Sequence, residues 1–63
     1  MDEARYIDKI RPYLRNDVSR FAMFVTDTLT GCTEHKDVAG DTDPDEVKAE
    51  LIARLQERAA ATS

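Results

Sequence analysis

Cysteine, histidine and long apolar runs are scarce in this chain of 63 residues. Cys32 is the only cysteine, so no disulfide can form within one chain. His35 is the only histidine. One cysteine and one histidine are too few ligands for a four-coordinate zinc site, and a lone histidine offers little scope for a catalytic pair of nucleophile and base. We find no catalytic or cofactor signature, and we expect neither an enzyme nor a bound cofactor or metal.

The longest apolar run is short, extending only from Phe21 to Val25. A membrane-spanning helix needs about 20 apolar residues, and no apolar segment follows the Met1-Asp2-Glu3 start. The sequence therefore predicts a soluble, cytoplasmic protein whose cysteine stays reduced.

Negative charge is in excess, and it is concentrated in the second half of the chain. Residues 1–31 carry five acids and five bases, whereas residues 32–63 carry eight acids and four bases, giving a net charge of −4. Nucleic-acid binding gains free energy when basic side chains release counterions from phosphates. The overall composition therefore disfavours non-specific nucleic-acid binding.

Apolar residues recur at helical spacing through the first half of the chain, from Tyr6 to Leu29. This spacing predicts helices over residues 2–11 and 13–30, with Asp2 as a possible N-cap. Pro12 either separates these two helices or kinks one long helix, because it lacks an amide donor and restricts the residue before it. Gly31 is expected to cap the second helix, and residues 31–43 are expected to form a loop.

The strongest start signal for a helix lies near the C-terminal end. Asp43 is placed as the N-cap, Pro44 as the first helical residue, and Glu46 follows the cap by three positions. We expect a helix over residues 44–60. Its apolar stripe is narrow and consists of Val47, Leu51 and Leu55, with Ile52 beside it.

These elements predict a single all-α domain, a hairpin or bundle of two or three helices that is completed by a second subunit. Sixteen large apolar residues lie between Tyr6 and Leu55, of which eleven lie between Tyr6 and Leu29 and four on the last helix. One narrow stripe cannot cover eleven side chains, and large apolar patches seldom stay in water. The partner-binding residues predicted from this surplus are Tyr6, Tyr13, Phe21, Met23, Phe24, Val25 and Leu29.

The first functional hypothesis is therefore a protein interaction module, which acts as a homodimer or as an accessory subunit on a larger partner. An alternative is a dimeric helical DNA-binding regulator that uses Arg5, Lys9 and Arg20. A further alternative is a metal or redox module at Cys32 and His35, whose Cys-x-x-His spacing brings a thiolate and an imidazole close together.

Overall fold

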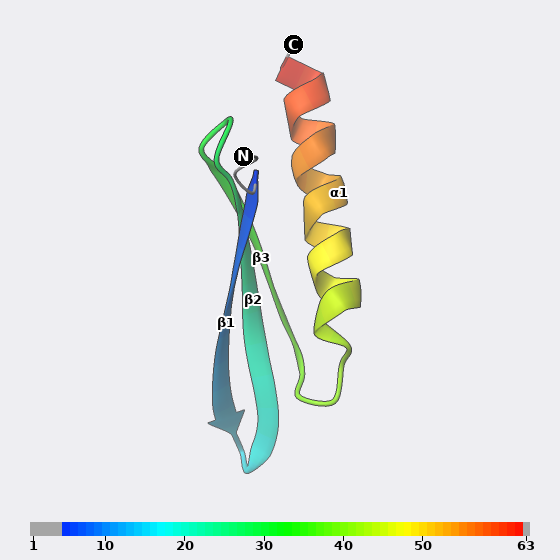
Figure 1. The fold of residues 1–63 in the computed structure, drawn as a ribbon. Coiled ribbons are helices and arrows are strands. Elements are labelled where there is room, and N and C mark those ends of the chain that lie inside the picture. Colours follow the sequence, from blue (N-terminus) through cyan, green and yellow to red (C-terminus); the bar gives the residue numbers. More distant parts are fainter. Residues whose placement is uncertain (1–4, 63) are drawn as a thin grey trace.

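The protein is a three-stranded antiparallel sheet with one helix packed along one face (Figure 1), as a computed structural model that describes residues 5–62 shows. The elements are β1 (Tyr6–Arg15), β2 (Val18–Asp27), β3 (Cys32–Ala39) and α1 (Pro44–Thr62). The strands lie in the order β1-β2-β3, so β2 is central and the other two are edge strands. Two layers result, a sheet and a single helix.

The prediction of an all-α helical bundle is wrong. The two helices expected over residues 2–11 and 13–30 are replaced by β1 and β2, and the loop expected over residues 31–43 contains β3. Residues four apart lie on one side of a helix, but they also lie on one side of a strand, whose side chains alternate. The spacing of Ile10 and Leu14, and that of Phe21 and Val25, therefore fits both structures. The expected Asp2 cap lies outside the described residues.

A tight turn at Asn16 and Asp17 joins β1 to β2. Both residues have positive φ, 52° and 63°, and the pair Arg15 and Val18 closes the hairpin. Two central residues with positive φ are typical of a type I′ turn, whose twist matches that of the flanking strands. Asn and Asp tolerate this conformation better than other side chains do, so the dipeptide was the sequence signal for a hairpin.

Pro12 lies within β1, opposite Phe21. Hydrogen-bonded and non-hydrogen-bonded pairs alternate along an antiparallel ladder, and the pair next to a two-residue turn is hydrogen-bonded. Counting from Arg15, the Pro12 pair is of the non-hydrogen-bonded kind. The missing amide therefore faces the free edge of the sheet and removes no ladder bond, so Pro12 neither ends nor kinks a helix.

The core lies between α1 and the facing side of β2 and β3. Val47, Leu51 and Leu55 are almost completely buried from solvent, with exposed fractions of 4%, 0% and 1%. They pack in one cluster with the buried strand residues Phe21, Met23, Val25 and Val38. The apolar stripe predicted for the last helix is thus the helix side of the core.

The N-terminus of α1 begins at Pro44, as the capping pattern predicts. The Oδ1 atom of Asp43 accepts a hydrogen bond of 3.0 Å from the amide of Asp45, and the helix extends to Thr62. Among residues 5–62, α1 is the only helix, and it is too polar to cross a lipid bilayer.

We predict that Gly40→Ala lowers the free energy of unfolding by about 1 to 3 kcal/mol, the usual range for overpacking. The Gly40 amide donates to the Ser19 carbonyl at 2.8 Å, and an added Cβ would lie only 2.9 Å from that same oxygen. Urea unfolding measures the decrease in stability.

Gly31→Asn is the matched control for this substitution. Gly31 has a φ of 77° but no atom within 4 Å of an added Cβ, and Asn tolerates the left-handed conformation. An equal decrease of stability in the two variants would contradict the close approach at Gly40.

Candidate functional site

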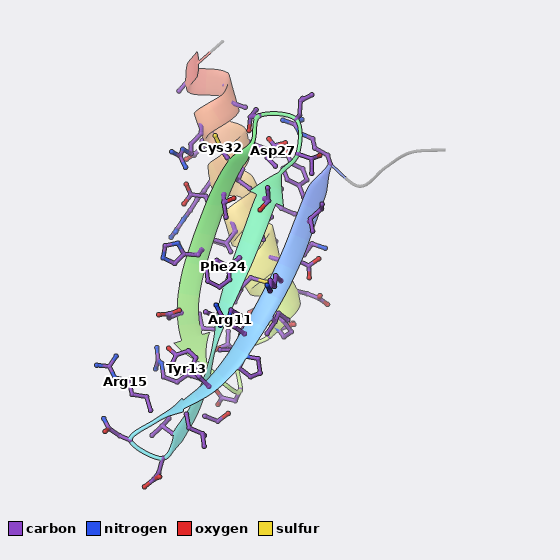
Figure 2. All side chains as sticks on the ribbon, turned by 90° about the vertical axis from the view of Figure 1, so that its left-hand side faces the viewer. Arg11, Tyr13, Arg15, Phe24, Asp27 and Cys32 are labelled. Carbon is purple, nitrogen blue, oxygen red and sulfur yellow. The ribbon has the colours of Figure 1, made fainter. Side chains whose placement is uncertain are left out.

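The face of the sheet opposite α1 is not covered by any part of residues 5–62, and we call it the open face. Side chains that pair across neighbouring strands point to the same side of a sheet. The partners of Phe24 are Lys9 on β1 and His35 on β3, while Met23 and Val25 face the core. Alternate residues of each strand therefore make up the open face, which Figure 2 shows with α1 behind the sheet.

The open face is basic although the chain is acidic. It carries four bases, Lys9, Arg11, Arg15 and Arg20, and one acid, Asp37. With His35 neutral, the formal charge of this face is +3, and the rest of the sequence carries −7, because the two sum to −4. On the other side of the sheet the strands carry −2 and α1 carries −1, and the remaining −4 belongs to the turns, loops and termini.

Aromatic side chains lie among these basic residues. The rings of Phe24 and His35 stack, with centroids 5.6 Å apart and planes 25° from parallel. On the other side of Phe24, towards β1, is a hollow of about 320 Å³, and its lining residues are Ile7, Lys9, Arg11, Phe24 and Thr26. Two cationic side chains and one aromatic ring therefore line the same hollow.

A similar group lies nearer the β1–β2 turn. Tyr13 pairs with Arg20 across the hairpin, and a second hollow, of about 460 Å³, is lined by Arg15, Asn16, Val18 and Arg20. Arg11, Tyr13 and Arg15 follow one another along the same side of β1 (Figure 2). The open face thus repeats an aromatic ring with two nearby cationic side chains.

The structure divides the residues predicted to bind a partner. Tyr13 and Phe24 lie on the open face. Tyr6 lies on the α1 side, packed against the core, and its Oη is buried without a hydrogen-bond partner among the described residues. Leu29 follows β2 and is 74% exposed. The other three predicted residues, Phe21, Met23 and Val25, are buried in the core of this chain.

The basic residues singled out for DNA binding are also divided. Lys9 and Arg20 lie on the open face. Arg5 forms an ion pair with Asp27 at the end of the hairpin that is farther from the β1–β2 turn. Arg11 and Arg15 join Lys9 because residues two apart on a strand point the same way. On a helix the same residues would be scattered around the circumference, so sequence reasoning missed this group. Their period of two was the signal.

Cys32 and His35 do not come together within one chain. They are three residues apart on β3, so their side chains lie on opposite sides of the sheet. Cys32 is opposite Asp27 and packs against the core, while His35 stacks on Phe24 on the open face. Among residues 5–62, no three potential metal ligands form a cluster.

Asp27, at the end of β2, carries the one buried charge among the described residues. Its carboxylate accepts hydrogen bonds from Nε and Nη2 of Arg5, at 3.0 and 2.9 Å, and from the amide of Leu29 at 3.0 Å. The hydrogen bonds from Arg5 are the main cause that lowers the pKa of Asp27 from 3.8 to about 2. This ion pair fastens the start of β1 to the end of β2.

No protein family, curated protein or solved structure matches this chain. The function is therefore inferred from the geometry and charge of the open face.

We predict that the Arg5 and Asp27 pair makes stability depend on pH at the acid end. A carboxyl whose pKa is lower in the folded protein stabilises it above its ordinary pKa, 3.8, and this contribution disappears as the pH falls to about 2. Asp27→Asn should therefore lower stability at pH 6 and reduce the further decrease between pH 6 and pH 2.

Urea unfolding at several pH values tests this prediction. Glu50→Gln serves as the control, because Lys36 and Arg54 also lower the pKa of Glu50 but this carboxylate lies on the surface of α1. An Asp27→Asn variant with the same acid dependence as the wild type would contradict the role of the buried pair.

Proposed function

We propose that this protein binds nucleic acid through the open face of its sheet. The observation that supports the proposal is the separation of charge, with four bases and one acid on a face that no part of residues 5–62 covers. Lys and Arg side chains bind phosphates and release counterions. Aromatic side chains between them add surfaces on which nucleobases stack.

The acids of α1 do not oppose this binding strongly. The molecule spans 17 Å between Cα atoms in its thinnest direction, and the sheet and α1 are its two layers. The Debye length is about 8 Å at physiological ionic strength, so acids on the outer side of α1 are largely screened from a ligand on the open face. The net charge of the whole chain is negative, and it therefore hides the positive charge of the open face.

Because the basic residues lie on strands and not on a helix, the sheet itself would contact the nucleic acid. Sheets and β-ribbons enter DNA grooves in some proteins, and exposed sheet faces bind single strands in others. Lys9 and Arg20, which the sequence predicts on the helices of a DNA-binding regulator, lie on strands β1 and β2. We therefore propose that the sheet, and not a helix, binds the nucleic acid. The cytoplasm, where the sequence predicts this protein, contains such ligands.

Salt dependence tests the proposal directly. We expect the logarithm of the association constant for a nucleic-acid oligomer to fall linearly with the logarithm of salt concentration. In Arg11→Gln/Arg15→Gln the slope should shrink by about 0.7 to 0.9 for each phosphate that the variant no longer neutralises. Fluorescence anisotropy titrations at several salt concentrations measure both quantities.

The matched control is Lys48→Gln/Arg54→Gln, which removes the same charge from α1. Both of these bases form surface ion pairs, with Asp8 and Glu50, and such pairs contribute little to stability. Equal decreases of affinity in the two double variants would show that net charge alone matters and would contradict a binding face.

A second candidate function, the protein interaction module, is supported by an uncovered apolar strip on β1. The helix packs mainly over β2 and β3, so the α1 side of β1 is left exposed beyond Tyr6 and the ion pair of Asp8 with Lys48. Ile10 and Leu14 are 44% and 73% exposed there, beside a hollow of about 250 Å³ whose lining includes Pro12, Phe21 and Pro44. We propose a second copy of this chain as the occupant, since β1 is also a free strand edge.

Light scattering over a hundredfold dilution tests the second candidate. If the strip is a dimer interface, the wild type dissociates on dilution and Ile10→Ser/Leu14→Ser is a monomer at every concentration. The control, Ile7→Ser, changes an exposed apolar residue on the opposite side of β1 and should leave the dimer intact. A wild type that is folded and monomeric throughout would exclude the homodimer.

A further inference from the structure

We infer that the open face binds single-stranded nucleic acid in preference to a duplex, with one unpaired nucleobase in the hollow beside Phe24. This inference rests on the proposed function and specifies the form of its ligand.

The hollow combines the two kinds of contact that a nucleotide needs. Phe24 supplies an aromatic ring, and Lys9 and Arg11 supply positive charge, while Ile7 and Thr26 complete the lining. Lys9 lies directly opposite Phe24 in the register of the hairpin. A nucleobase that contacts the ring therefore has its own phosphate within the range of flexible cationic side chains.

A nucleobase in the hollow would add a third ring to the stacked pair of Phe24 and His35. His35 stacks on Phe24 from β3, whereas the hollow is lined from β1, so the two flank Phe24 from opposite sides of β2. Phe24 lies at the centre of the open face (Figure 2). A planar ligand in the hollow would thus contact the ring of Phe24, which His35 packs against from β3.

Aromatic rings favour a single strand because of the geometry of nucleobases. In a duplex, each nucleobase is covered by its neighbours in the stack and paired at its edge, so its flat face is not free to contact a side chain. In a single strand the nucleobases can splay outward and stack on aromatic residues. A duplex would use the cationic side chains of the open face but would place no nucleobase on Phe24 or Tyr13.

The second group on the open face continues the path of such a strand. Tyr13 lies four residues beyond Lys9 on β1, which is about 13 Å at the rise of an extended strand. Arg11 lies between them on the same side, and Arg20 pairs with Tyr13. Cationic side chains thus follow the length of β1, and a strand along β1 would meet an aromatic ring at two points, Phe24 beside Lys9 and Tyr13 between Arg11 and Arg15.

Anisotropy titrations with a labelled oligothymidylate and with a duplex of equal length test the inference. We expect the wild type to bind the single strand more tightly at the same salt concentration. Phe24→Leu keeps an apolar side chain but removes the ring, and it should weaken single-strand binding by roughly 5- to 150-fold. Its binding to the duplex should be unchanged.

Phe24→Tyr is the control, because it retains the ring and should bind the single strand as the wild type does. Circular dichroism and urea unfolding establish that each variant is folded. A Phe24→Leu variant that binds the single strand as tightly as the wild type would overturn the inference, and so would a wild type that prefers the duplex.

The same titrations separate this inference from the proposal on which it rests. Salt-dependent binding that disappears in Arg11→Gln/Arg15→Gln but is indifferent to Phe24 would retain a nucleic-acid face and reject the single-strand ligand. Absence of binding to both oligonucleotides would reject the proposed function and the inference with it.

Discussion

The packing of α1 against one side of β2 and β3 is the constraint on which the rest of this structure depends. It forms the hydrophobic core cluster, in which Val25 and Leu51 are fully excluded from solvent. Once that side is buried, the alternation of strand side chains decides the direction of every other residue in the sheet. A slip of one residue would exchange Met23 and Phe24 between the core and the solvent.

The remaining contacts hold that register. The turn at Asn16 and Asp17 closes one end of the hairpin, and the ion pair of Arg5 with Asp27 closes the other. At that second end the carbonyl of Arg5 also accepts a hydrogen bond of 2.8 Å from the amide of Thr28. Because α1 packs mainly on β2 and β3, β1 is held by these two ends, by its ladder with β2 and by two contacts near its start. These are the packing of Tyr6 against the core and the ion pair of Asp8 with Lys48. The α1 side of β1 stays partly apolar and open as a result.

One buried side and one open side also explain how an acidic chain can present a basic surface. Arg11 and Arg15 are separated from the acids of α1 by the thickness of the sheet and the core, and Asp37 is the one acid that shares their face. A net charge describes a small protein poorly when one face is basic and the rest of the chain is acidic. The position of each charge in the fold matters more for recognition than their sum.

By itself, the sequence determined the features that depend on neighbouring residues. Asp43 and Pro44 start α1, Val47, Leu51 and Leu55 form its buried stripe, and a single cysteine excludes an internal disulfide. Only the tertiary structure decided the rest, because residues spaced by four share a side in a helix and in a strand alike. The packing of β2 against α1, between residues at least 22 positions apart, decided which side of the sheet is buried. That choice buried Phe21, Met23 and Val25 and gathered Lys9, Arg11, Arg15 and Arg20 on one face.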